Sequence, residues 1–149
     1  MYGIRRKTAN EMDRVLPAKR SEMMSKVRGT NTGPELIVRR IISSLGYHYR
    51  LHRRDLPGKP DLVFPGRKKV IFIHGCFWHR HECSAGRQLP KTRPEFWNQK
   101  LARNVERDRE VQEQLRKMGW NVLIIWTCQL KQKDGLVTTI KGFLDQIPE

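Results

Sequence analysis

Three cysteines and two histidines have the side chains and the spacing of a metal site. Cys76, His79, His81 and Cys83 lie within one stretch of eight residues, and Cys128 follows an apolar segment much further along the chain. Zinc in a closed structural site takes four thiolate or imidazole ligands in a tetrahedron. We therefore expect a zinc ion that fastens this loop to the end of a strand, and the alternative is that the three cysteines are buried separately.

Only one of the two histidines can join three cysteines in a four-ligand site. His79 and His81 are two residues apart, so an extended loop would point both side chains the same way. The histidine that does not bind zinc is available for proton transfer, to which a neutral imidazole is suited at physiological pH. The spacing leaves this choice open.

Two acidic residues stand at the ends of predicted elements. Asp61 opens a strand directly after residues 57–60, whose sequence is Pro-Gly-Lys-Pro. A carboxylate in that position can hold Mg²⁺ and, through it, a phosphate, although it can equally cap the turn. Glu35 lies at the start of a predicted helix, where the helix dipole favours an acidic residue without any further role.

Asp108 lies on the apolar stripe of a predicted long helix, and Asn104 falls on the same stripe. The apolar members of the stripe are Trp97, Leu101, Val105, Val111 and Leu115. A carboxylate that faces the core is costly without a partner. A histidine is a suitable partner because the carboxylate fixes its tautomer and stabilises its charged form. The alternative is a surface ion pair with one of three nearby arginines, Arg103, Arg107 and Arg109.

Three large aromatic side chains complete the set of residues with possible functions. Phe77 and Trp78 follow the first cysteine in a polar loop, and Trp97 lies early in the long helix. Aromatic side chains on a rigid loop can enter between bases, at a cost that is smallest where the bases are mismatched. The alternative is that these rings cover the zinc site or fill the core.

The elements that must position these residues follow from periodicity and turn residues. Helical spacing predicts helices over residues 21–27, 32–46, 94–119 and 135–147. Alternating or apolar runs predict strands over 47–54, 61–64, 69–73 and 121–126, and Tyr47, Tyr49 and Leu51 would be the buried residues of the first. The tight turn between 61–64 and 69–73 makes those strands antiparallel neighbours. The expected fold is α/β, with a mixed central sheet flanked by helices.

Composition indicates a nucleic-acid partner. The chain has 149 residues with 38% hydrophobic residues, and 30 Lys and Arg against 15 Asp and Glu give a formal net charge of +15. A basic surface binds phosphates because it releases their counterions. Residues 1–20 carry six basic residues and form either a solvated tail or an arm along DNA, and residues 21–149 suit a single domain. We expect no membrane span and a cytosolic location, where structural disulfides are rare.

Four segments together resemble the very short patch repair endonucleases, known as Vsr, from about Arg20 to Lys131. These segments are Pro57-Gly58-Lys59-Pro60-Asp61, His74-Gly75-Cys76-Phe77-Trp78-His79, Thr92-Arg93-Pro94-Glu95-Phe96-Trp97 and Asn104-Val105-Glu106-Arg107-Asp108. The resemblance implies a fold related to type II restriction enzymes. It also implies an enzyme that nicks DNA beside the thymine of a T:G mismatch, such as arises when 5-methylcytosine deaminates, and hence a functional link to a cytosine-5 DNA methyltransferase.

The resemblance also implies a role for each candidate residue. Asp61 and the backbone carbonyl of Ile73 would bind magnesium, and His79 would act as the general base, oriented by Asp108. His74 and Glu35 would support the phosphate and the metal-bound waters. The implied zinc ligands are Cys76, His81, Cys83 and Cys128. The implied DNA contacts are Phe77, Trp78 and Trp97 as intercalating rings, Met24 from the other side, and Lys100 and Asn104 at the mismatched pair.

The chain departs from the family pattern at two places, and two other functions fit part of the observations. Ile73 replaces a usual threonine, which is tolerable if only its carbonyl binds metal, and a run of histidines is broken to His79-Arg80-His81-Glu82. One alternative is a DNA-binding zinc protein without catalysis. The other is a restriction-like nuclease that cuts both strands, normally as a dimer, whereas a nicking enzyme is expected to be a monomer.

Overall fold

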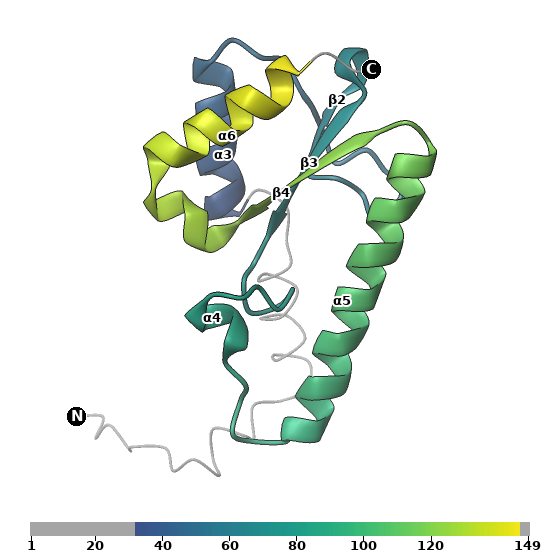
Figure 1. The fold of residues 1–149 in the computed structure, drawn as a ribbon, viewed down its shortest axis with the longest axis vertical. Helices are drawn as coiled ribbons and strands as arrows, with labels where there is room; N and C mark the ends of the chain where they lie inside the picture. The colour runs from purple at the N-terminus through teal and green to yellow at the C-terminus, as the bar shows by residue number, and fades with distance from the viewer. Residues whose placement is uncertain (1–31, 147–149) are drawn as a thin grey trace, which may run out of the picture. The chain divides into compact units, whose positions relative to one another are not determined.

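A four-stranded mixed sheet forms the centre of the structure, a computed structural model that describes residues 32–146 (Figure 1). The strands are β1 (Arg50–Leu51), β2 (Leu62–Phe64), β3 (Lys69–His74) and β4 (Asn121–Trp126), in that spatial order. β1 pairs with β2 and β2 with β3 in antiparallel fashion, whereas β3 and β4 are parallel. The antiparallel pairing predicted for residues 61–64 and 69–73 is therefore confirmed.

Helices cover both faces of the sheet, as the sequence predicted. α3 (Gly33–Ser44) and α6 (Lys133–Asp145) lie on one face, and α5 (Pro94–Lys117) lies on the other (Figure 1). The remaining elements are short: a 3₁₀ turn η1 (Pro65–Arg67), one helical turn α4 (Ser84–Arg87) and a 3₁₀ turn η2 (Thr127–Lys131). The sheet and its helices form a three-layer α/β domain, and the described residues from Gly33 onward belong to one compact unit.

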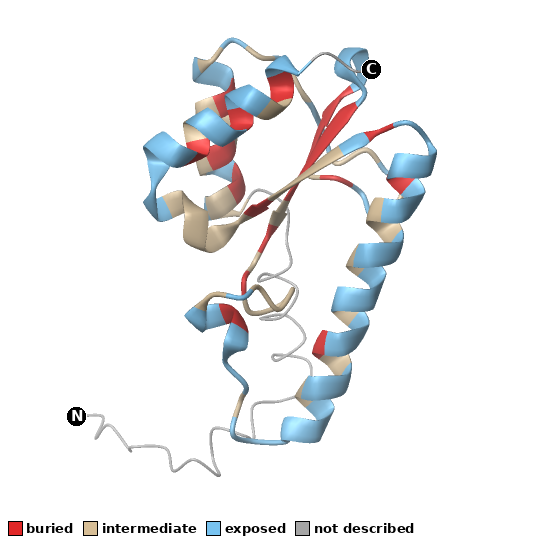
Figure 2. Ribbon diagram, viewed as in Figure 1, coloured by how far each residue is buried: buried red, intermediate tan, exposed pale blue. Residues whose placement is uncertain are grey.

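The two faces of the sheet bury separate cores because neighbouring strand residues point in opposite directions. In β3, Ile71 packs with α3 and α6, while Val70 and Phe72 pack with α5. Figure 2 shows β2 and β3 buried along most of their length. A strand covered on both faces needs an unbroken apolar run, which explains why the sequence of β3 does not alternate.

Lys69, at the start of β3, is completely buried yet keeps its polar contacts. Its ammonium group donates to the carbonyl oxygens of Phe143 at 2.5 Å and Leu144 at 3.2 Å, and also to that of Gln146. These carbonyls lie at or beyond the end of α6, where the last helical turn has no backbone partner of its own. Lys69 therefore caps the C-terminal end of α6 and ties it to the central sheet.

Two expectations about buried faces are wrong. The strand predicted over 47–54 is reduced to β1, and Leu51 within it is 42% exposed, although Tyr47 and Tyr49 do pack against the core. β1 is an edge strand with a single neighbour, and it ends where His52 adopts a left-handed backbone. Val105 is also 42% exposed, because the half of α5 around it extends beyond the sheet (Figure 2).

The helix boundaries match closely, apart from segments that lie outside the described residues. α3, α5 and α6 begin and end within three residues of the predicted helices. The basic arm over 1–20, the helix predicted over 21–27 and Met24 all fall outside residues 32–146, so these and the domain boundary at 20/21 stay predictions. Within the described part of the chain, no helix has both the length and the apolar composition required to cross a bilayer.

Candidate active site and cysteine cluster

The antiparallel pairing of β2 and β3 brings the start of β2 to the end of β3. Asp61 immediately precedes β2, and its Oδ2 atom accepts a hydrogen bond of 2.7 Å from the backbone N–H of Ile73. Burial raises the pKa of the Asp61 carboxyl to about 6, against the opposing effect of this hydrogen bond. A partly buried carboxylate whose charge is only partly compensated is well placed to receive a cation.

Glu35 and His52 extend this acidic position into a cluster. Glu35, in the first turn of α3, is only 6% exposed, and its Oε2 atom lies 3.4 Å from Nε2 of His52. The ligand atoms of Glu35, His52 and Asp61 all lie within 4.8 Å of one another. We call these three residues the carboxylate cluster, of which the sequence analysis identified Glu35 and Asp61 but missed His52.

On the other side of Ile73 lies a histidine pair, one member of which contacts Asp108 of α5. The rings of His74 and His79 stack with centroids 3.8 Å apart and planes 9° apart, and His79 Nδ1 lies 2.5 Å from Asp108 Oδ2. Burial lowers the pKa of His74 to about 4, and the neighbouring His79 acts in the same direction. His74 is therefore neutral at physiological pH. The predicted partnership of a histidine with Asp108 is present in the structure.

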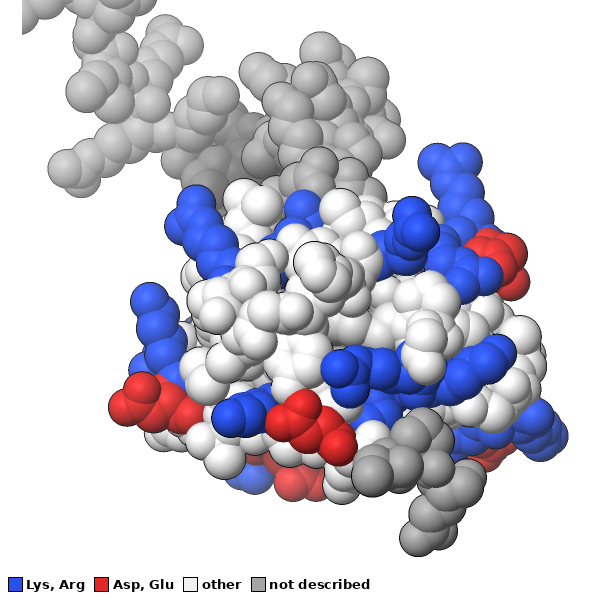
Figure 3. Space-filling view, turned by 90° about the horizontal axis from the view of Figure 1, so that it is seen from above, with Lys and Arg blue, Asp and Glu red and all other residues white. Residues whose placement is uncertain are grey.

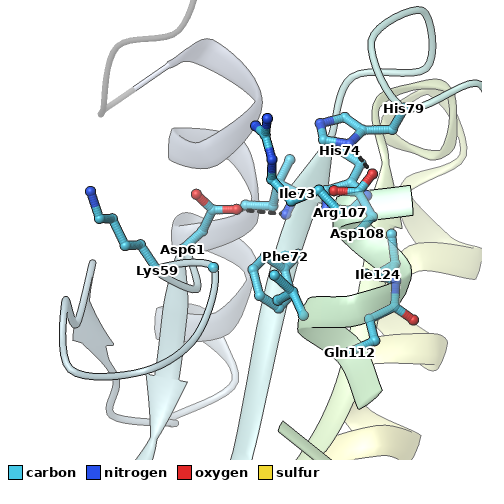
Figure 4. Close-up of a pocket in the computed structure, with 12 residues that line it drawn as sticks. Lys59, Asp61, Phe72, Ile73, His74, His79, Arg107, Asp108, Gln112 and Ile124 are labelled. Atoms are coloured by element: carbon cyan, nitrogen blue, oxygen red, sulfur yellow. Dashed lines mark hydrogen bonds and ion pairs between the residues drawn. The ribbon is translucent and has the colours of Figure 1, made fainter. Parts of the chain in front are cut away.

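A cleft of about 280 Å³ connects Asp61 with the histidine pair and Asp108. Figure 4 shows Asp61 to one side of Ile73 and the contact between His79 and Asp108 to the other. The residues that line the cleft are Gly58, Lys59, Asp61, Phe72, Ile73, His74, His79, Arg107, Asp108, Val111, Gln112 and Ile124. Basic and acidic groups around one opening suit a substrate that carries a phosphate.

Gly58 sets the distance between the loop before Asp61 and α5. Its backbone is left-handed, with φ +71°, and a Cβ atom there would lie 2.4 Å from Cγ1 of Val111. Only glycine satisfies both conditions without displacing the helix. The Pro-Gly-Lys-Pro segment is thus a spacer that holds one wall of the cleft against the other.

The four predicted zinc ligands converge, although they come from distant parts of the sequence. The ligand atoms of Cys76, His81, Cys83 and Cys128 lie within 4.8 Å of one another, and we call these residues the cysteine cluster. Burial raises the pKa of the Cys128 thiol to about 11, and the neighbouring Cys76 thiol adds to this. A Cβ atom on Gly86 would lie 1.9 Å from the carbonyl oxygen of His81, so α4 packs directly against this loop.

The two histidines of the loop differ in their surroundings. His81 lies with Nδ1 3.5 Å from Sγ of Cys128, and its ring stacks on Trp126 at 4.3 Å. His79 contacts Asp108 instead and lies outside the cysteine cluster. His81 therefore lies with the thiols, and His79 lies with the Asp108 carboxylate.

The aromatic residues form a half-buried group beside the cleft. Phe77 and Trp78 contact each other and Trp97 with ring centroids 5.1 to 5.9 Å apart. The Lys100 ammonium lies 5.5 Å from the centroid of Trp97 and 5.6 Å from that of Trp78. We call Phe77, Trp78 and Trp97 the aromatic cluster, and it is not part of either hydrophobic core.

Two further residues adjoin the aromatic cluster. The Asn104 side chain donates to the carbonyl oxygen of Trp78 at 3.2 Å and so steadies the loop that carries the rings. Phe96, which the sequence analysis did not select, is 43% exposed and lies under the guanidinium of Arg93 at 4.6 Å. Its place next to Trp97 in the sequence was the only signal for it.

The end of the domain that points upward in Figure 1 is basic. Figure 3 shows one end of the molecule, over which Lys and Arg side chains are spread while Asp and Glu are fewer. This agrees with the formal charge of +15 for the whole chain. Such a surface attracts polyanions at a distance and releases counterions on contact with them.

Comparison with known proteins identifies the family. A profile described as DNA mismatch endonuclease Vsr matches residues 12–85. The type II nicking enzyme V.XorIIP of Xanthomonas oryzae is 46% identical over 133 residues, which are 89% of this chain and 97% of that protein. The DNA mismatch endonuclease Vsr of Escherichia coli is 40% identical over 119 residues, 80% of this chain and 76% of that protein. With its carboxylate, histidine and cysteine groups assembled around one β-sheet, this chain belongs to the Vsr family of DNA endonucleases.

Proposed function

We propose that this protein nicks one strand of double-stranded DNA beside the thymine of a T:G mismatch, in a magnesium-dependent reaction that initiates very short patch repair. The observation that carries the proposal is that Asp61, His79 and Asp108 line the same cleft, in which His79 contacts Asp108. A carboxylate suited to a cation and a histidine suited to activate water are the two parts that hydrolysis of a phosphodiester needs. The family and the name of the relative from Escherichia coli support the mismatch as substrate.

The residues at the carboxylate cluster fit magnesium. Asp61 would bind the ion with its carboxylate and Ile73 with its backbone carbonyl, and Glu35 would reach it directly or through water. Mg²⁺ prefers such hard oxygen donors, and the burial that raises the pKa of Asp61 is relieved by a cation. When bound, the ion would polarise the scissile phosphate and stabilise the charge that develops on it.

His79 is placed to accept the proton of the attacking water. Because its Nδ1 atom contacts Asp108, the N–H lies on that side and Nε2 keeps its lone pair. As the water oxygen attacks phosphorus and the bond to the leaving oxygen breaks, Nε2 takes up the proton and Asp108 stabilises the imidazolium. The neutral ring of His74 stacks on His79 and holds it in place without adding a second positive charge.

The cysteine cluster fits a structural zinc ion. Three thiols and one imidazole within 4.8 Å form a complete set of four soft or borderline ligands. The ion would fasten the loop over 76–83 to η2, which follows β4. Since His79 lies inside that loop, this zinc would fix the general base relative to the sheet, and it would take no part in the chemistry.

The aromatic cluster supports recognition of a mismatch. Phe77, Trp78 and Trp97 would enter the base stack, a step that costs a few kcal/mol and costs least where pairing is already weak. Lys100 and Asn104 would then face the mismatched pair, and Met24 would approach from the opposite side. A protein of this kind needs one active site to nick one strand, so we propose that it acts as a monomer.

The proposed reaction also places the protein in a cellular context. T:G mismatches arise when 5-methylcytosine deaminates, so the enzyme is expected to work in cells that contain a cytosine-5 DNA methyltransferase. The flanking sequence that the methyltransferase modifies would then define the sites that need repair. We expect this protein to act in the cytosol.

A cleavage assay tests the proposal directly. The protein is incubated with two end-labelled duplexes that differ only by a T:G pair in place of C:G, with and without magnesium. A His79→Ala variant runs alongside. A single nick in the thymine strand that requires magnesium and His79 supports the proposal. Equal cutting of both duplexes supports a restriction-like enzyme instead, and binding without cleavage in any condition supports a DNA-binding zinc protein.

A further inference from the structure

Arg39 and His52 surround the Glu35 carboxylate beside Asp61. A guanidinium nitrogen of Arg39 donates to Glu35 Oε2 at 3.0 Å and lies 3.2 Å from His52 Nε2. The same His52 nitrogen is 3.4 Å from Glu35 Oε2. Arg39 is one helical turn after Glu35 in α3, so the helix itself aligns the two side chains. The sequence analysis selected neither Arg39 nor His52.

The backbone places His52 at this point despite a conformational cost. His52 has φ +48°, a left-handed value that is unfavourable for a non-glycine residue. It follows β1 directly, and β1 pairs with the first two residues of β2, next to Asp61. The short edge strand therefore brings His52 to the start of β2, and such strained residues concentrate at functional sites.

The chemistry of the contacts suggests that Arg39 acts on Glu35 directly and that His52 acts on it through Arg39. Arg39 can only donate hydrogen bonds, so its 3.2 Å contact engages the lone pair of His52 Nε2. That lone pair is then unavailable to a metal ion. The ligand atoms of Glu35 and Asp61 lie within 4.8 Å of each other, so their negative charges repel, and the guanidinium of Arg39 on Glu35 offsets this repulsion. Arg39 thus allows the two carboxylates to be neighbours.

We propose that Arg39 and His52 are positioning residues of the magnesium site. They hold the Glu35 carboxylate beside Asp61 so that both carboxylates face one divalent cation and its bound waters. The inference rests on the proposed function, because it assigns residues that support the same cation. A purely structural role, in which the group stabilises the junction of α3 and β1, is the alternative to be separated from it.

Binding of Mn²⁺ to the full-length protein without DNA gives a readout that does not depend on nicking. Free Mn²⁺ is followed by electron paramagnetic resonance for the unmodified protein and for Arg39→Ala, His52→Ala and Glu35→Gln. Residues that support a metal site from outside it typically change metal affinity by about 10 to 100-fold. We expect a loss of this size in all three variants. Arg40→Ala and His48→Ala alter exposed residues of the same types and should bind Mn²⁺ normally.

Coupling to Glu35 distinguishes positioning from general stabilisation. If Arg39 and His52 act through Glu35, adding Arg39→Ala or His52→Ala to Glu35→Gln should weaken Mn²⁺ binding no further. The variants Arg39→Lys, which keeps the charge, and His52→Gln, which keeps an acceptor, should recover part of the affinity. They also give an answer if an alanine variant fails to fold. In nicking assays, the reduction in rate caused by Arg39→Ala or His52→Ala should become smaller as the magnesium concentration rises.

Each outcome decides the inference. The inference is overturned if Arg39→Ala and His52→Ala bind Mn²⁺ as tightly as the unmodified protein does. It is also overturned if their losses of affinity add fully to the loss caused by Glu35→Gln. If the unmodified protein nicks T:G duplexes and the variants bind Mn²⁺ normally, only this inference fails. If the unmodified protein neither binds Mn²⁺ nor nicks DNA, the proposed function fails, and the positioning role fails with it.

Discussion

The Nδ1 atom of His79 and the Oδ2 atom of Asp108 lie 2.5 Å apart, although the two residues come from different elements. His79 belongs to the loop after β3, and Asp108 belongs to the middle of α5. The short contact leaves the other ring nitrogen, Nε2, as the one that can accept a proton. The orientation of the His79 ring is thus set by a helix that packs on the far side of the sheet from α3 and Glu35.

Replacement of Asp108 by asparagine should slow nicking without weakening DNA binding. The amide can also donate a hydrogen bond to Nδ1, which favours the tautomer with its proton on Nε2 and removes the proton acceptor. In a related histidine–aspartate arrangement this change costs about 10⁴-fold, and we expect a loss of about 10² to 10⁴-fold here. Single-turnover rates and a separate binding titration measure the two quantities. A rate within about threefold of the unmodified protein would exclude this role for Asp108.

Replacement of Asp61 by asparagine should abolish nicking and stabilise the magnesium-free protein at alkaline pH. Folding raises the pKa of Asp61 from 3.8 to about 6, so the folded state holds the proton more tightly than the unfolded state. The contribution of protonated Asp61 to the free energy of unfolding is complete below pH 4 and is lost as the pH rises through about 6. At pH 8 the buried charge therefore costs up to about 3 kcal/mol.

Urea unfolding at pH 4.5 and pH 8 checks this prediction. The experiments contain no added magnesium and no chelator, because a chelator would remove the zinc ion proposed at the cysteine cluster. The increase in the free energy of unfolding caused by Asp61→Asn should be larger at pH 8 than at pH 4.5. Added magnesium should stabilise the unmodified protein by mass action but not the variant. A variant that is less stable than the unmodified protein at pH 8 would show that the pKa of Asp61 is not raised by folding.

Replacement of Cys128 by alanine should remove one zinc ion per chain and destabilise the fold. The site would be left with three ligands, and the loop over 76–83 would lose its attachment to η2. Structural zinc sites contribute several kcal/mol, so we expect the Tm to fall by roughly 10 °C. Elemental analysis and thermal unfolding measure the two effects. Zinc content unchanged in Cys128→Ala would remove Cys128 from the ligand set.

Replacement of Phe77 and Trp78 by alanine should reduce discrimination between T:G and C:G duplexes. Stacking of a base on an aromatic ring contributes about 1 to 3 kcal/mol. Each substitution should thus weaken binding to the mismatch by roughly 5 to 150-fold, with a much smaller effect on matched DNA. Met118→Ala, which alters an exposed apolar residue at the end of α5, is the matched control. Equal losses on both duplexes would mean that the rings contribute only to general DNA binding.

Much of this architecture was predictable because its signals are local. The helices α3, α5 and α6 have helical periodicity with recognisable ends, and the hairpin of β2 and β3 follows from one tight turn. The partnership of Asp108 with a histidine was predictable as well, because a carboxylate on a buried helix stripe requires a partner. The motifs of the Vsr family then indicated which histidine it was.

The features that could not be predicted depend on contacts between distant segments. His52 reaches the carboxylate cluster only because β1 pairs with β2 and then turns into a left-handed conformation, and neither has a marker in the sequence. Leu51 and Val105 fit buried patterns but lie where the sheet and its covering layers end. A hydrophobic pattern indicates which face of an element is apolar, but not whether another element covers it.

The parallel pairing of β3 with β4 has a consequence for how the enzyme folds. The hairpin of β2 and β3 closes locally, whereas the pairing of Lys69 with Asn121 requires the whole loop and α5 between them to be in place. Contacts between distant segments form slowly because the chain entropy of closure is lost before they stabilise it. His79 and Asp108 both lie within this long connection. His79 and Asp108 should therefore come together only at this late step, and the proposed binding of zinc between Cys83 and Cys128 would speed its completion by shortening the same loop.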